Sequence, residues 1–279
     1  MQNFDRQYLL TVYRSGIKQF SCGQADALHI RFSVQKADLE TENTAKICLW
    51  NLSSSHLGIL KQRDCSLILQ AGYGSNLPVI LQGNISFIRT ELDGADRKTT
   101  LEAVDGGWVL RDNWLSLAYC GPINTRQIIE DLAKQMGLAV IFSSQAVYQD
   151  LSRGFSYSGL AGGALDKICA GSGMSWSILN GVLQIKKPTE AWFEKIYLLN
   201  SQTGLLGSPK EILIAAQHKW EFDLPGWEVE FFLNGAIEVA DYVRLESQAV
   251  RGSFRVYSLQ MEGDNYQADW LCRACLVEV

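Results

Sequence analysis

The sequence contains little of what usually separates or exports protein domains. Only five of its 279 residues are proline, and no tract of serine and glycine interrupts it, so we expect its parts to pack together rather than swing on linkers. No apolar run approaches the roughly 18 residues that cross a bilayer. Residues 1–16 lack the charged and then apolar stretch of a secretory signal. We therefore expect a protein made and folded in the cytoplasm, without membrane insertion.

An excess of basic residues is also missing. The formal net charge is −5, which argues against a dedicated nucleic-acid-binding protein, because such proteins usually present a basic face. The seven cysteines are an odd number, spread through predicted strands. Without an export signal, we expect most of them to be reduced and buried.

Residue patterns that carry catalysis are equally scarce. Cys272 and Cys275 form a CxxC pair, but the pair lies in a predicted terminal strand, where residues three apart point to opposite faces. No second pair completes a zinc site. We interpret both cysteines as strand residues rather than as a redox or metal site.

Three further arrangements have a simpler structural explanation. Cys65 would need a histidine base to act as a nucleophile, and none of the three histidines has a flanking pattern of that kind; they are His29, His56 and His218. The glycines of 159–163 lack the spacing of a phosphate-binding loop. Acidic residues two apart on a strand are typical of a solvated face; the pairs are Glu228 with Glu230 and Glu91 with Asp93. The sequence predicts no catalytic residue, no cofactor and no metal site.

What the sequence does contain is the composition of a sheet protein. Eight Trp, ten Tyr and eleven Phe favour sheets and, less strongly, sizeable interfaces. In residues 28–35 the apolar side chains fall on every second position, which predicts a strand with one buried face. A helix at 54–62 and five more strands complete this first part, and together they predict a barrel or sandwich. The other strands are expected at 8–13, 45–52, 65–73, 77–89 and 98–104.

The character of the chain changes after Gly121. Asn124 can cap an amphipathic helix, and Gly137 stands where that helix would end. A strand, a second helix and a hairpin follow at 139–142, 162–170 and 175–185, with Gly171 and Gly173 ending the helix and Asn180-Gly181 forming the hairpin turn. From about residue 189 the strand pattern returns, at 193–199, 212–216, 227–233, 242–246, 252–262 and 269–277. The sequence therefore predicts a mainly β fold with an α+β insert.

An ordered series of motifs in the third part resembles bacteriophage tail baseplate hub proteins. The series is a glycine-rich turn, a strand, a longer strand ending in Gly-Asp and a tryptophan strand. Its matching residues are 198–209 with Gly204, Gly207 and Pro209, then 243–247, then 252–259 with Gly263 and Asp264, and finally Asp269 and Trp270. Met261 and Glu262 occupy the place where hub proteins often carry His-Ser, which is a departure from the pattern.

The rest of the chain adds weaker matches in the expected order. The strand at 43–52, which contains Asn51, and the segments around Gly83 and Asp105 look like parts of tail tube and hub barrels. The helix at 164–169 and the hairpin at 176–185 resemble a small α+β domain shared by hubs and by ring-forming secretins. The flanking barrels favour the hub. We interpret the motif residues as turn and core positions that define the fold.

The resemblance implies two tail-tube-like antiparallel β-barrel domains, at 1–120 and 189–279, separated by a small helix–strand–helix–hairpin module at 121–188. Hub proteins of this kind form homotrimers, so that six barrels match a hexameric tail tube and the threefold end matches a trimeric spike. The implied partners are the tail tube protein, the spike protein and other baseplate proteins of the virion. Phage DNA would pass through the lumen without specific binding, and a negative chain suits such a lumen because it repels phosphates.

Two other functions stay open at this point. A ring-forming, secretin-like envelope component would share the α+β module but should carry an export signal. A tail-associated cell-wall hydrolase would need a cysteine or carboxylate whose mutation abolishes cleavage.

Overall fold

The computed structural model describes residues 5–23, 27–37, 43–106, 110, 113–188, 190, 192–215, 223–267 and 269–278. Their contacts divide them into two compact units. The sheet unit contains the described residues of 5–37, 43–104 and 192–278, and the insert unit contains those of 105–190. The fold is mainly β with a small helical insert, which confirms the fold class predicted from the sequence.

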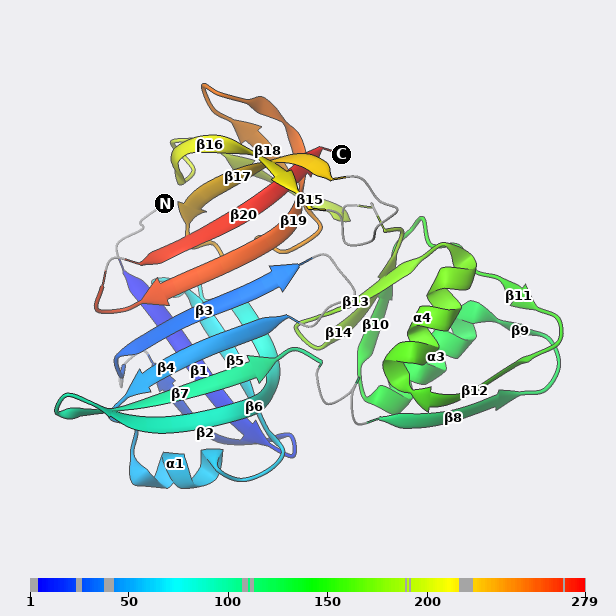
Figure 1. Ribbon diagram of the computed structural model, residues 1–279, viewed down its shortest axis with the longest axis horizontal. Coiled ribbons are helices and arrows are strands. Elements are labelled where there is room, and N and C mark those ends of the chain that lie inside the picture. The colour runs from blue at the N-terminus through cyan, green and yellow to red at the C-terminus, as the bar shows by residue number, and fades with distance from the viewer. Residues whose placement is uncertain are drawn as a thin grey trace. The chain divides into compact units, whose positions relative to one another are not determined.

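The sheet unit is built on one thirteen-stranded sheet (Figure 1). Its main path runs β16-β17-β20-β19-β3-β4-β7-β6-β5-β1-β2, and β18 pairs with both β19 and β15. The strands of the first part are β1 (Arg6–Arg14), β2 (Ile17–Gly23), β3 (Ile30–Ala37), β4 (Thr44–Trp50), β5 (Cys65–Tyr73), β6 (Val79–Asp93) and β7 (Asp96–Val104). Those of the third part are β15 (Trp192–Leu199), β16 (Leu205–Ile214), β17 (Leu224–Phe232), β18 (Asp241–Glu246), β19 (Arg251–Asp264) and β20 (Trp270–Glu278).

The first and third parts of the chain meet inside this sheet, where β3 pairs antiparallel with β19. Each side chain that the alternation in β3 predicts to be apolar is buried, at Ile30, Phe32 and Val34. The predicted strands are all present. The sequence did not predict β2, because its first three residues are exposed and the apolar alternation begins only at Phe20.

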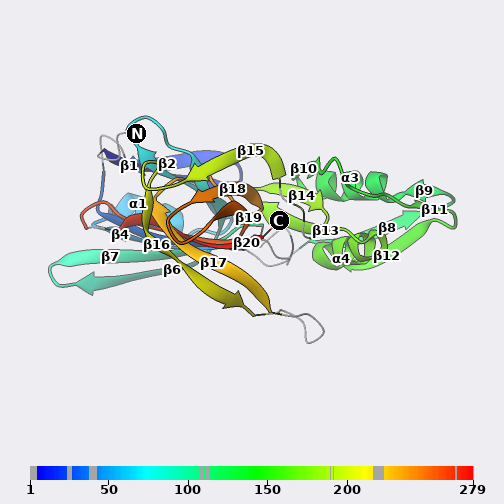
Figure 2. The ribbon, with the colours of Figure 1, turned by 90° about the horizontal axis from the view of Figure 1, so that it is seen from above.

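The long strand β6 joins two regions of the sheet. Its first half pairs with β5 and its second half with β7, and the register shifts between Ile85 and Phe87. Beyond that point the β6–β7 hairpin projects from the rest of the unit in both views (Figures 1 and 2). Near its tip, Leu92 is 81% exposed.

One short helix, α1 (Ser54–Leu60), belongs to the sheet unit. Ser53 caps it, because its hydroxyl accepts a hydrogen bond from the backbone N–H of His56 at 3.2 Å. Leu57 and Leu60 are buried. No described helix has the length and apolar character needed to cross a membrane.

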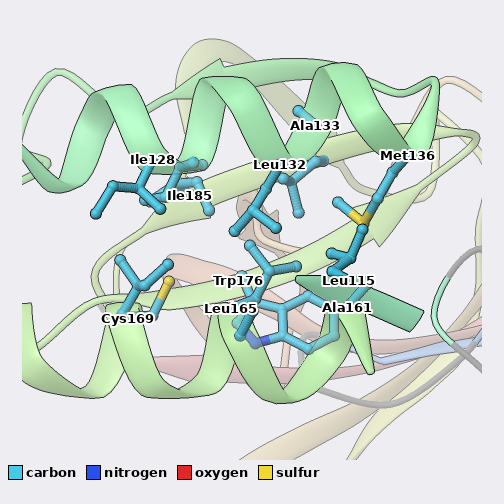
Figure 3. Packing of buried hydrophobic residues seen from close by; sticks show 14 of the residues in the cluster. Leu115, Ile128, Leu132, Ala133, Met136, Ala161, Leu165, Cys169, Trp176 and Ile185 are labelled. Atoms are coloured by element: carbon cyan, nitrogen blue, oxygen red, sulfur yellow. The ribbon is translucent and has the colours of Figure 1, made fainter. Parts of the chain in front are cut away.

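In the described part of the insert unit, two long helices face each other across an apolar core. They are α3 (Thr125–Met136) and α4 (Ala161–Ser172), and Figure 3 shows side chains of both pointing into the space between them. Leu132 and Leu165 are fully buried there, beside Trp176. The strands of this unit are β8 (Trp114–Tyr119), β9 (Ile123–Asn124), β10 (Ala139–Phe142), β11 (Asp150–Leu151), β12 (Phe155–Leu160), β13 (Ser175–Leu179) and β14 (Val182–Lys186).

The predicted ends of helix α3 are confirmed, with Asn124 as its N-cap and Gly137 as a left-handed C-cap. One prediction for the insert unit was wrong: Gly171 lies within α4, and Gly173 alone ends that helix. The predicted order of helix, strand, helix and hairpin is present, and a ribbon of β8 and β12 adds to it.

The division into domains at 1–120, 121–188 and 189–279 stays a prediction. The strand β8, within residues 1–120, pairs with β12 in the insert unit. Strands of the two outer parts share one sheet.

Candidate assembly sites

The turn between β19 and β20 contains a fully buried carboxylate. Oδ1 of Asp264 accepts hydrogen bonds from the backbone N–H groups of Tyr266 (2.9 Å) and Gln267 (3.0 Å) and lies 3.0 Å from Nε2 of His29. Oδ2 accepts a hydrogen bond from Nε of Arg31 at 3.0 Å. Burial alone would raise the pKa of Asp264, but the bonds from Tyr266, His29 and Arg31 outweigh it and hold the pKa below 3.8.

Aromatic rings complete this cluster. The imidazole of His29 stacks between the rings of Trp50, at 3.9 Å, and Tyr266, at 4.5 Å. A histidine held by two rings and a carboxylate in this way has a structural explanation.

Two other motif residues pack next to Asp264. A Cβ atom at Gly263 would lie 2.3 Å from Cζ of Phe32, so only glycine fits there. The ring of Phe32 meets the buried ring of Trp270 edge-on at 5.4 Å. The structure therefore brings Gly263, Asp264 and Trp270 together in one packed region where β19 and β20 join.

The glycine-rich turn connects β15 to β16. Its polar residues close it: the Thr203 hydroxyl donates to the Leu198 carbonyl at 2.7 Å and accepts from the Asn200 N–H at 2.8 Å. Gly204 has a φ of +111°. Gly207, with a φ of +62°, and the buried Pro209 lie where the β16–β17 register shifts. The predicted turn is shorter than expected, because β16 already begins at Leu205.

The remaining motif residues of the first part occupy turn and core positions. Asn51 has a positive φ of 58°, and its side chain accepts from the Arg97 N–H at 3.0 Å and donates to Asp96 at 2.8 Å. It thereby joins the end of β4 to the start of β7. Gly83 is buried in β6, paired with Leu67 of β5.

Asp105 belongs to the insert unit, where it is buried and holds the predicted hairpin. Its carboxylate accepts from the backbone N–H groups of Asn180, at 2.5 Å, and Gly181, at 3.1 Å. Both turn residues have positive φ, as a two-residue hairpin turn requires. The sequence identified Asp105 and Asn180-Gly181 separately but gave no signal that they touch.

The catalytic candidates that the structure describes have structural surroundings. Burial raises the pKa of the Cys65 thiol, which is the opposite of what activates a nucleophile. His56 stacks on Phe20, and His218 lies outside the described residues. Burial raises the pKa of Cys272 to about 12, and Cys275 is half-buried. Within the described part of the chain, no group of three or more metal-ligating side chains comes together.

A groove of about 630 Å³ lies beside strand β15 in the sheet unit. We call it the β15 groove; its lining includes Ile196, Leu198, Phe232, Ile237 and Pro78. Ile196 is 65% exposed. Exposed apolar side chains next to an unpaired strand edge are typical of a protein–protein contact.

Comparison of the whole structure with solved structures gives matches along nearly the full chain. A tail protein from Neisseria meningitidis is 11% identical, covers 97% of this chain and 96% of its own, and has a TM-score of 0.63. The 43 kDa tail protein of prophage MuSo2 from Shewanella oneidensis is 8% identical, with 97% and 98% covered and a TM-score of 0.64. The chain has the fold of phage tail proteins.

The same fold occurs in a bacterial secretion machine. A component of the Escherichia coli type VI secretion system, described as structurally similar to the bacteriophage T4 tail proteins gp27 and gp5, has a TM-score of 0.65 at 8% identity. It covers 96% of this chain and 76% of its own. No family model matches the sequence, and no curated protein matches it. The fold shared with the tail proteins above confirms the resemblance to tail hub proteins.

Proposed function

We propose that this protein is a structural hub of a phage tail baseplate, assembling as a homotrimer between a hexameric tail tube and a trimeric spike. The observation that carries the proposal is the fold shared with two tail proteins over 96% or more of their length. In this role the trimer contacts the tube protein, the spike protein and other baseplate proteins. It also forms part of the channel through which phage DNA passes without specific binding.

The edges of the sheet support assembly with further chains. Among the described strands, β2, β15 and β16 each pair along one side only. Each carries a large apolar residue exposed to solvent: Ile17 is 69% exposed, Ile196 65% and Leu213 67%. Unpaired edges with such side chains favour association, and pairing between subunits would cover them.

Light scattering across a concentration series, with and without the candidate spike protein, tests the proposal. A homotrimer has a mass of about 93 kDa, three times 31.1 kDa. We expect to measure this mass either for the protein alone or after the spike protein is added. A protein that stays monomeric and does not bind the spike protein would contradict the adaptor role.

A matched pair of variants links the trimer to the sheet edges. Ile196→Lys places a charge on the β15 edge, and we expect it to weaken trimer formation by at least tenfold in concentration. Val147→Lys alters an exposed apolar residue that lies outside the strands of the insert unit and serves as the control. Far-UV circular dichroism must show both variants folded, and equal trimer formation by both would contradict a role for this edge.

The proposed role is structural and requires no catalytic step. Zymography on a peptidoglycan gel is expected to show no clearing by the purified protein. Clearing that survives repurification would favour the hydrolase instead.

A further inference from the structure

A second depression lies in the sheet unit, over strands β3, β4 and β19. Its volume is about 430 Å³. Short side chains, Ser33 and Cys48, lie between longer charged ones, and the pairing of β3 with β4 places Ser33 opposite Lys46. We call it the cationic pocket, because three basic residues from three strands line it: Arg31, Lys46 and Lys98.

Two of these cations are held in place before any ligand arrives. Arg31 donates from Nε to Asp264 at 3.0 Å and from Nη2 to Gln267 at 2.6 Å. The ammonium of Lys98 lies 5.7 Å from the ring centroid of Trp50, a cation–π contact. Preorganised groups lose less conformational entropy when they bind a ligand.

Two of the carboxylates near the pocket, Glu262 and Asp264, are already engaged, while Glu102 and Glu91 stand opposite Lys46 and Lys98 in the strand pairing. Glu262 accepts from Arg273 at 2.9 Å and from Gln260 at 2.8 Å, and Asp264 is bound as described above. In the part of the chain that the structure describes, neither Lys46 nor Lys98 has an ion-pair partner. One further carboxylate, that of Asp269, also lines the pocket.

We propose that the cationic pocket binds a phosphate-type oxyanion between Lys46 and Lys98. Ammonium groups form short, charge-assisted hydrogen bonds to such oxygens. The Asp269 carboxylate is an acceptor, so it favours an anion that also carries a hydroxyl donor, as hydrogen phosphate does. Cys48 and Thr100, which contact each other at 3.6 Å, add polar groups next to it. The proposal does not depend on the assembly role.

Titration of the full-length protein with inorganic phosphate, followed by backbone amide chemical shifts, tests this site. We expect saturable shifts at residues 31, 33, 46 and 48. Lys46→Gln and Lys98→Gln should each weaken the apparent affinity by about fivefold to tenfold, since each removes one charge-assisted bond. Lys18→Gln, which alters an exposed lysine on β2, is the matched control and should change it less than twofold.

Two further titrations separate the sources of the anion. Succinate, a carboxylate without the hydroxyl donor, should bind more weakly than phosphate. A short DNA duplex that shifts the same amides at a lower phosphate concentration would assign the pocket to phosphates of nucleic acid. Shifts that never saturate, or an equal loss of affinity in Lys18→Gln, would show an adventitious ion only and overturn the proposal.

Discussion

At the scale of single residues, motif positions are explained by contacts that allow one side chain only. The space at Gly263 is closed by Phe32 on one side and Trp270 on the other. Asp264 is fully buried yet meets a donor for each of its oxygens. Both residues make their contacts at the junction of β19 and β20.

Gly263→Ala should destabilise the protein by about 1–3 kcal/mol, because the added methyl overpacks a site whose nearest neighbour is a buried ring. Gly58→Ala is the matched control. Nothing lies within 4 Å of a Cβ at Gly58 in helix α1, and alanine is the better helix former by about 1 kcal/mol. Urea unfolding of the two variants measures the difference, and equal midpoints would contradict the packing argument.

Acid should weaken the contribution of Asp264 to the free energy of unfolding. Its pKa lies below 3.8 in the folded state, so its bonds stabilise the fold fully above about pH 4 and are lost as the pH falls through the folded pKa. Asp264→Asn removes that contribution. We expect the gap in unfolding free energy between wild type and variant to shrink below pH 4. A gap that stays constant down to the acid limit of folding would count against this account.

Residue chemistry alone identified these positions only in part. The turn-forming character of Asn180-Gly181 is local, and the sequence predicted it, whereas Gly204 was placed in a turn by the resemblance to hub proteins. The partners of Asp105 and Asp264 were not predictable, because Asn180 lies 75 positions from Asp105 and His29 lies 235 positions from Asp264. No periodicity relates residues so far apart.

At the scale of elements, a buried ion pair ties β3 to the segment that precedes β18. Nζ of Lys36 lies 2.6 and 2.8 Å from the two carboxylate oxygens of Glu238. The Lys36 side chain is fully buried, and that of Glu238 is 16% exposed. Removal of one partner therefore leaves a charge with little water around it.

Lys36→Met should cost about 3–5 kcal/mol in unfolding free energy, because it removes the ammonium that faces the Glu238 carboxylate at a site with little water. The double variant Lys36→Met/Glu238→Leu should recover most of that loss. Arg89→Gln breaks an exposed pair with Glu91 and should cost less than about 1 kcal/mol. Denaturant unfolding measures the unfolding free energy of all three variants. A double variant no more stable than Lys36→Met would contradict the argument from the buried ion pair.

Elements with regular alternation or clear caps were predictable, and irregular ones were not. Helix α3 has a capping Asn124 and a terminal Gly137, and both ends were predicted. Strand β2 begins with three exposed residues, and the ribbon of β8 and β12 mixes small polar with apolar side chains. Such segments become strands because a partner strand is available to them, which is a tertiary effect.

At the scale of the whole molecule, the sheet unit is one sheet made from two distant stretches of chain. Pairing of β3 with β19 is the seam between them. Neither stretch alone completes the hydrogen bonding of the strand at its edge.

A fragment of residues 1–104 should therefore be poorly soluble when produced alone, and production together with residues 191–279 should return it to solution as a complex. Sedimentation and co-purification measure this. A control pairing of 1–104 with the insert fragment 105–190 should not rescue it. Two soluble, independently folded fragments would instead support separate outer domains.

The pairing of β3 with β19 also determines how long one edge of β3 stays unpaired while the chain is synthesised. Ala37 pairs with Ser258 and Arg31 with Asp264, so roughly 220 to 230 residues are made after β3 before its partner exists. At a translation rate of about 5–20 residues per second, that edge of β3 stays unpaired for roughly 10 to 45 s. During this interval the nascent chain exposes the edge of β3 that later pairs with β19, and this open edge is where pairing with another chain is most easily started.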